Sequence, residues 1–224
     1  MNKQNKNREK WKDIKISREL RDIIHGYIMS DGYVRVGGSM QVEQSLAQEK
    51  FVEWLYEQLK IIRTDSEISL VTRTDKRINK VTQSKRFFTR NLLTGFHRMW
   101  YESSPSGEEG EVRYKKRLPK NLKSFFNATF ITVWFAGDGT KMIGQRGAKF
   151  EVTAFTAEER LKLKTLFKEK FNINAVINRA GQSTTGNPQW SLSINSPDYD
   201  KFRALITQID LIPTIFPYKL HTKA

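Results

Sequence analysis

Two aspartates, Asp31 and Asp138, are the residues whose surroundings most suggest chemistry. Each lies near the end of a nine-residue run that is largely apolar and helical in composition: IHGYIMSDG at 24–32 and ITVWFAGDG at 131–139. A helix C-terminus carries partial negative charge, so a carboxylate there costs roughly 0.3–1 kcal/mol. The same unfavourable placement at two positions indicates that both carboxylates have a function.

Small residues lie close before each aspartate. They are Gly26 and Ser30 in the first run, and Ala136 and Gly137 in the second. Small side chains let two backbones approach closely, so side-by-side helices would bring the carboxylates together. Two such charges repel unless a cation lies between them. Because Mg²⁺ takes oxygen ligands, Asp31 and Asp138 are predicted to hold a magnesium ion.

The two halves of the chain look like copies of one another. The aspartates lie about half of the 224 residues apart. Each is followed by a glycine-bearing turn, a strand-like run (39–45 and 148–155) and a helical stretch (47–60 and 156–171). Two further strand-like runs and another helix then follow in both halves. We interpret this self-similarity as a tandem duplication, with the order αββαββα in each repeat.

These residues resemble the paired motifs of the LAGLIDADG homing endonucleases, in their single-chain, two-repeat form. In the first run the matching positions are Gly26, Ile28, Asp31 and Gly32; in the second they are Asp138 and Gly139. In the first run Met29 replaces the first aspartate of the motif, whereas the second acidic position holds the metal in this family. The resemblance covers roughly residues 15 to 220.

The resemblance implies an α/β (α+β) fold of two pseudo-symmetric αββαββα repeats. Antiparallel, saddle-shaped sheets would surround a central pair of helices. The implied function is site-specific hydrolysis of one phosphodiester on each DNA strand, across the minor groove of a long target, leaving 3′ overhangs. The reaction would use Mg²⁺, for which Ca²⁺ or Mn²⁺ could substitute in the site. An intracellular location is implied, with mitochondria and chloroplasts among the compartments that it allows.

The family's single-chain members use a lysine from each half near the scissile phosphates. By position, Lys116 and Lys219 resemble these lysines. The alternative for each is a simple phosphate contact or a solvated surface charge.

Composition also points to a polyanionic partner. Lys and Arg number 39 against 24 Asp and Glu, which gives a net charge of +15. Such a charge favours nucleic acid as the partner. The absence of cysteine excludes disulfides and thiolate metal sites. No apolar run approaches the roughly 20 residues that span a bilayer, so no membrane association is expected.

Two basic or amide-bearing hairpins are predicted to enter the major groove of duplex DNA, although a solvated face is the alternative. The first turns near residues 75–80, and the second joins strands near 172–181 and 189–196. Predicted contacts in the first repeat are Arg35, Gln41, Glu43, Arg73, Lys76, Arg77, Lys80, Gln83, Lys85 and Arg86. Those in the second are Arg146, Lys149, Glu151, Thr153, Asn178, Arg179, Gln182, Ser191, Ser193 and Asn195. Because the two sets differ, the target is expected to be non-palindromic.

The predicted organisation has four parts. Residues 1–16 form an N-terminal arm that is either mobile or touches DNA, and 17–102 form the first repeat. Residues 103–117 form a linker, and 118–224 form the second repeat with an extended tail. Ser17 and Ser196-Pro197 are helix-start signals, and His25 is expected to be a packed helix residue.

Two functions remain open from the sequence. The first is a DNA endonuclease that works as a monomer and needs no protein partner. The second is a binding protein on the same fold, either an intron RNA maturase or a DNA-binding protein that does not cut.

Overall fold

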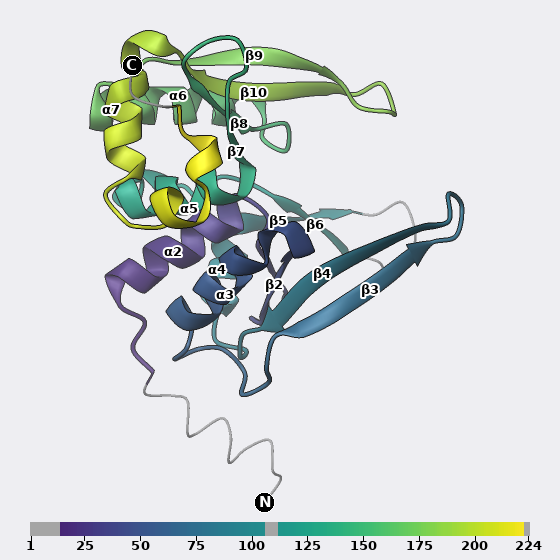
Figure 1. The fold of residues 1–224 in the computed structure, drawn as a ribbon. Coiled ribbons are helices and arrows are strands. Elements are labelled where there is room, and N and C mark those ends of the chain that lie inside the picture. Colours follow the sequence, from purple (N-terminus) through teal and green to yellow (C-terminus); the bar gives the residue numbers. More distant parts are fainter. Residues whose placement is uncertain (1–13, 106–111, 222–224) are drawn as a thin grey trace, which may run out of the picture.

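The computed structural model describes residues 14–105 and 112–221, and its halves repeat one order of elements (Figure 1). The first half comprises α2 (Arg18–Met29), β1 (Tyr33–Val34), β2 (Met40–Ser45), α3 (Glu49–Gln58), β3 (Ser69–Asp75), β4 (Lys80–Phe88) and α4 (Thr94–Trp100). The second comprises α5 (Ala128–Asp138), β7 (Gly139–Lys141), β8 (Ala148–Glu151), α6 (Ala157–Phe171), β9 (Ala175–Gln182), β10 (Pro188–Ile194) and α7 (Ser196–Ile206). The predicted αββαββα order is confirmed in both halves.

Each half contains one four-stranded antiparallel sheet. The strand orders are β1-β2-β4-β3 and β7-β8-β10-β9, which are equivalent. In β2, Met40 and Val42 are buried while Gln41 and Glu43 face the other way, as the alternation predicts. Helices α2 and α5 lie between the two sheets, and the hairpins β3–β4 and β9–β10 project in the same direction (Figure 1).

The two central helices begin at side-chain caps. Ser17 Oγ accepts a hydrogen bond from the Leu20 N–H at 3.1 Å, which confirms the predicted start of α2. Asn127 Oδ1 accepts from the Phe130 N–H at the start of α5. Residues 130–136 of α5 are all buried, and all but Thr132 are apolar, because other elements pack around this helix on several sides.

Glycines allow α2 and α5 to pack backbone against backbone. A Cβ atom added to Gly26 would lie 2.6 Å from the Phe130 carbonyl oxygen. One added to Gly137 would lie 2.4 Å from Ser30 Oγ and 3.0 Å from Asp31 Oδ2. The close approach expected from the small residues is therefore present.

Several elements differ from the sequence-based expectation. Strand β8 ends at Glu151, so Ala154 is exposed and Phe155 is buried instead. The N-cap of α7 is Asn195, one residue before the predicted signal. The tail is helical rather than extended, in α8 (Ile212–Ile215) and the 3₁₀ helix η3 (Pro217–Lys219). A proline in each first turn removes only an N–H that has no partner within the helix.

The interval expected to be a linker is largely β-structure. Strands β5 (Tyr101–Pro105) and β6 (Val112–Lys116) form a separate antiparallel pair, in which Tyr101 lies opposite Lys116. Residues 106–111 and most of the predicted arm, 1–13, lie outside the described residues. Two further 3₁₀ helices are η1 (Leu46–Gln48) and η2 (Leu122–Ser124). Within the described ranges, every helix is too short or too polar to span a lipid bilayer.

We expect Gly26→Ala and Gly137→Ala each to lower the free energy of unfolding by about 1–3 kcal/mol, because the added methyl group overlaps the neighbouring helix. Urea unfolding of the variants measures this effect. Gly95→Ala is the matched control, since Gly95 is an exposed helical glycine with open space around its Cβ position. Equal effects at all three positions would contradict the proposed packing constraint.

Candidate active site

The ends of the central helices bring two carboxylates into each other's electrostatic field. Asp31 follows Ser30, the C-cap of α2, and Asp138 is the last residue of α5. Burial, and after it the negative charge of Asp31, raise the pKa of Asp138 from 3.8 to about 7. Lys116 and Lys219 partly offset this increase. The sequence-based expectation that Asp31 and Asp138 converge agrees with this geometry.

Gln44 is a site residue that the sequence reasoning missed. Its side chain is buried, and its Nε2 donates a hydrogen bond to Asp31 Oδ2 at 2.9 Å. A polar residue at an inward-facing position of a predicted strand was the available signal. The two sheets can be aligned through one pair in each: Val34 pairs with Met40, and Lys141 pairs with Ala148. Four residues after Met40 comes Gln44, and four residues after Ala148 comes Val152. Asp138 therefore has an apolar residue at the position where Asp31 has a hydrogen-bond donor.

Two lysines cap the C-terminal ends of the central helices. Lys116 Nζ donates to the carbonyl oxygens of Ile28 and Ser30, both at 2.7 Å, at the end of α2. Lys219 Nζ donates to the Ala136 carbonyl oxygen at 2.7 Å, and also reaches those of Phe135 and Gly137. Helix C-termini carry unsatisfied carbonyls and partial negative charge. Each lysine therefore donates hydrogen bonds to free carbonyl oxygens and offsets negative charge at the end of one central helix.

Burial lowers the pKa of both lysines, and that of Lys219 falls to about 8. The charges of Asp138 and Asp31 act in the opposite direction on both. The four groups therefore form one electrostatic cluster. The lysines come from unlike elements, the end of β6 and η3, yet they occupy equivalent places.

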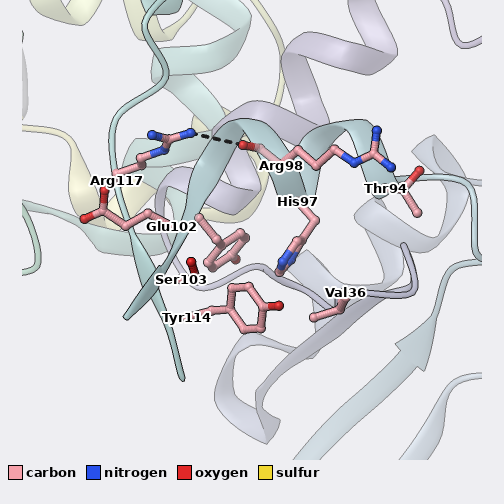
Figure 2. Close-up of a pocket in the computed structure, with 9 residues that line it drawn as sticks. Val36, Thr94, His97, Arg98, Glu102, Ser103, Tyr114 and Arg117 are labelled. Carbon is pink, nitrogen blue, oxygen red and sulfur yellow. Dashed lines mark hydrogen bonds between the residues drawn. The ribbon is translucent and has the colours of Figure 1, made fainter. Parts of the chain in front are cut away.

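The segment after Asp31 is held by the root of the β5–β6 hairpin. Tyr101 Oη donates to the Gly32 carbonyl and accepts from the Val34 N–H, both at 3.3 Å. His97 Nδ1 lies 2.9 Å from the Val34 carbonyl oxygen. A cavity of about 560 Å³ borders this root, and Figure 2 shows His97, Tyr114 and Arg117 among its lining residues. None of the predicted site residues lines this cavity, and the backbone beside Asp31 is held by the contacts of Tyr101 and His97.

The open face of the first sheet gathers only part of the predicted contact set. Register places Gln41, Glu43, Arg73 and Arg86 on one face. The predicted contacts Gln83 and Lys85 alternate to the opposite face, because Lys85 pairs with the buried Gln44. Lys85 Nζ lies 4.0 Å from the Glu49 carboxylate of α3. Gln83 and Lys85 therefore lie on the face opposite Glu43 and Arg73, and their contact with DNA stays a prediction.

Residues near the tip of the first hairpin are exposed, as expected for a DNA-contacting turn. They are Lys76, Arg77 and Lys80. Arg77 Nη2 donates to Asp75 Oδ2 at 2.9 Å, which fixes its guanidinium group to the turn. Arg35, which follows β1, is also exposed and donates to Gln41 Oε1 at 3.4 Å.

In the second sheet, Lys149 and Glu151 are exposed on β8 as predicted. Ser191 and Ser193 lie on the same face but are only 7% and 2% exposed, because β10 is flanked by β8 and β9. Asn178 Nδ2 donates to Ser193 Oγ at 3.0 Å across this face. Both serines are therefore nearly buried in this structure, and their contact with DNA stays a prediction.

Five other predicted contacts in the second half occupy different places. Thr153 lies outside β8, and its Oγ1 accepts from the Trp190 N–H at 2.7 Å. Asn195 is the N-cap of α7 rather than a strand residue. Arg146 Nη1 donates to Asp200 of α7 at 2.9 Å. The remaining two are Arg179 and Gln182. They pair with Trp190 and Pro188, respectively, which places both on the face opposite Asn178.

Comparison with known proteins identifies the family. Residues 21–202 match the sequence model of the LAGLIDADG DNA endonuclease family. The chain belongs to this family. The match covers both aspartate-bearing helices and both sheets, so the resemblance of the two short motifs extends over most of the chain.

Individual members and related structures support the LAGLIDADG assignment. Cytochrome b mRNA maturase bI2 of Debaryomyces hansenii is 21% identical over 174 residues, which are 74% of this chain and 62% of that protein. The chain thus spans less than two thirds of that relative. The structure of the homing endonuclease I-WcaI bound to its DNA recognition sequence aligns with a TM-score of 0.76 and 18% identity, covering 100% of this chain and 96% of the other. Full-length DUF199/WhiA from Thermatoga maritima aligns with a TM-score of 0.51 and 16% identity, over 96% and 65% of the respective chains. The structural matches establish the LAGLIDADG fold.

The donor groups of this LAGLIDADG site fit a hard divalent cation. Asp31 and Asp138 supply carboxylate oxygens, and a positive charge between them would relieve the repulsion that raises the pKa of Asp138. Among the described residues, no group of three or more His, Cys, Asp or Glu side chains gathers at metal-binding distances. A site of two carboxylates leaves positions for water, which suits Mg²⁺.

We expect Mg²⁺ affinity to depend on pH through Asp138. Below a pKa of about 7 its carboxyl must lose a proton before it can bind the cation, so affinity should fall about tenfold per pH unit in that range and level off above it. Calorimetric titration on both sides of pH 7 measures this. Asp138→Asn should remove the pH dependence together with most of the affinity.

The same raised pKa has a stability consequence. Because the folded chain holds the Asp138 proton more tightly than the unfolded chain, the metal-free protein should lose stability as pH rises from about 4 to about 7. Asp138→Asn should lack this loss. Equal pH profiles for both proteins would contradict the assigned environment of Asp138.

Proposed function

We propose that this LAGLIDADG family member is a site-specific endonuclease. It hydrolyses one phosphodiester on each strand of duplex DNA, across the minor groove of a long, non-palindromic target, and leaves 3′ overhangs. The observation that carries this proposal is the pair of carboxylates at the ends of the packed central helices, with one lysine at each end. A net charge of +15 supports a polyanionic substrate.

In this proposal Asp31 and Asp138 are the residues that would hold Mg²⁺. A bound divalent cation supplies charge neutralisation at the leaving oxygen and lowers the pKa of the attacking water. Gln44 orients the Asp31 carboxylate through its hydrogen bond. Lys116 and Lys219 keep the helix ends in place and offset negative charge beside each scissile phosphate. Each half thereby serves one strand.

One chain suffices for this reaction, so we propose a monomer with internal pseudo-two-fold symmetry. Both carboxylates and both lysines come from the same polypeptide. The two hairpins project on the same side of the central helices (Figure 1), and that arrangement suits wrapping along one duplex without a protein partner.

A second candidate function is RNA splicing support or DNA binding without cleavage. The observation that favours it is the similarity to cytochrome b mRNA maturase bI2 over 74% of this chain. An organellar site of action belongs to the same proposal, because the RNA named for that relative is the cytochrome b mRNA. Retention of both aspartates favours cleavage, since binding alone does not need them.

We expect Asp31→Asn and Asp138→Asn each to abolish double-strand cleavage while DNA affinity changes by less than about tenfold, because the carboxylates act on the metal rather than on the DNA. A plasmid library of candidate targets, incubated with Mg²⁺ or with EDTA, reports cleavage. Gel shifts with Ca²⁺ report binding. Asp210→Asn, at an exposed residue, is the control and should cut normally. Near wild-type cutting by either site variant would contradict the metal assignment.

Binding should also depend strongly on salt. Replacing Lys76, Arg77 and Lys80 by glutamine should flatten the plot of log K against log salt by about 0.9 for each phosphate that these side chains no longer neutralise. The matched control replaces three exposed lysines on the helices and their ends: Lys60, Lys164 and Lys168. If both triple variants change the slope equally, the hairpin is not the DNA-contacting element.

A further inference from the structure

One carboxylate lies among the arginines on the open face of the first sheet. Glu43 Oε1 accepts hydrogen bonds from Arg73 Nη1 and Ser84 Oγ. Its Oε2 accepts from Gln41 Nε2 at 2.8 Å and lies 3.7 Å from Arg86 Nη1. The Glu43 side chain is only 14% exposed. We call Glu43 and these four partners the Glu43 network.

The network leaves neither Glu43 nor Gln41 free to read a base. Both carboxylate oxygens of Glu43 are engaged. The Gln41 amide donates to Glu43 and accepts from Arg35, so the paired donor and acceptor that adenine recognition requires are both in use. Among the four predicted contacts that register places on this face, Arg73 and Arg86 remain.

The arginines keep donors for a partner. Only Nη1 of Arg73 takes part in the network, and the Arg73 side chain is 52% exposed. Arg86 contributes Nη1, and its guanidinium carbon lies 5.2 Å from the centre of the Phe88 ring. An arginine whose fork is fixed before binding loses less side-chain entropy when it makes a bidentate contact.

We propose that Glu43 is a positioning residue that holds Arg73 and Arg86 as coupled guanine readers in one half of the DNA target. This inference rests on the proposed endonuclease function and adds the base that the first half-site contains. Arginine contacts the O6 and N7 atoms of guanine in the major groove. Because one carboxylate fixes both arginines, preferences at the two guanine positions should change together.

The second sheet has no equivalent arrangement in the part of the chain that the structure describes. Glu151 is the counterpart of Glu43 by strand register, and its Oε1 accepts from the Thr153 backbone N–H at 2.7 Å. Arg179 pairs with Trp190 and lies on the other face of this sheet. Guanine selectivity of this kind is therefore specific to the first half-site.

A carboxylate on a DNA-facing surface also repels phosphates. Glu43 therefore opposes non-specific affinity while it orders the arginines, which is a way to gain specificity. Glu43→Gln keeps the shape but removes the charge. It should weaken discrimination and, at the same time, leave affinity for random DNA unchanged or higher. Loss of the fold would lower both base discrimination and affinity for random DNA. A positioning role and a purely structural role of Glu43 therefore predict opposite changes in affinity for random DNA.

The experiment is selection of bound duplexes from a randomised library, with the full chain and Ca²⁺. For the unaltered protein we expect guanine at two or more positions on one side of the cleavage site. Glu43→Gln should reduce guanine preference at these positions by about tenfold each, and the other half-site should be unaffected. Glu151→Gln is the matched control and should leave these guanines enriched. Thermal unfolding of each variant verifies the fold.

The outcomes separate the inference from the function on which it rests. Absence of any sequence preference in the unaltered protein overturns both. Sequence-specific binding without guanine in one half-site, or guanine preference that Glu43→Gln leaves intact, overturns the inference alone. If Glu43→Gln does not fold, Ser84→Ala removes one anchor of the carboxylate with a smaller change, and it should lower the same preferences in the same direction.

Discussion

The close packing of α2 on α5 is the constraint on which the site depends. Because Gly26 and Gly137 have no side chains, the two backbones come near enough for the helix ends to share one electrostatic environment. That environment is unfavourable by itself, since two carboxylates and two negative helix ends meet there. Lys116 and Lys219 offset part of it, yet burial and the charge of Asp31 together still raise the pKa of Asp138. The fold thus gathers negative charge at the centre of a chain whose net charge is +15.

The two halves of the molecule share an architecture but not a chemistry. The sheets have equivalent strand orders, yet Gln44 supports Asp31 and the apolar Val152 occupies the corresponding place beside Asp138. One sheet face holds arginines around a carboxylate, while the other holds buried serines and an asparagine. The two halves are thus similar frames whose open faces carry different side chains.

The sequence predicted what depends on local pattern. Strand alternation, the Ser17 cap and the spacing of the aspartates identified the elements, the central helix pair and the converging carboxylates. Residues whose roles depend on cross-strand register were harder to predict. The face of Gln83 and Lys85 follows from pairing with β2, and burial of Ser191 and Ser193 follows from flanking strands. Gln44 and the β5–β6 hairpin depend on contacts with segments distant in the sequence, which no local window contains.

The position of Lys116 shows where the first half of the molecule ends. It lies at the end of β6, after the first sheet and α4 are complete, and it caps the helix that opened that same half. Lys219 has the equivalent place at the end of the second half. The segment from a central helix to its own lysine is therefore the repeating structural unit, and the β5–β6 hairpin lies within the first of the two. A half that kept α2 but ended at α4 would lack the lysine that caps α2.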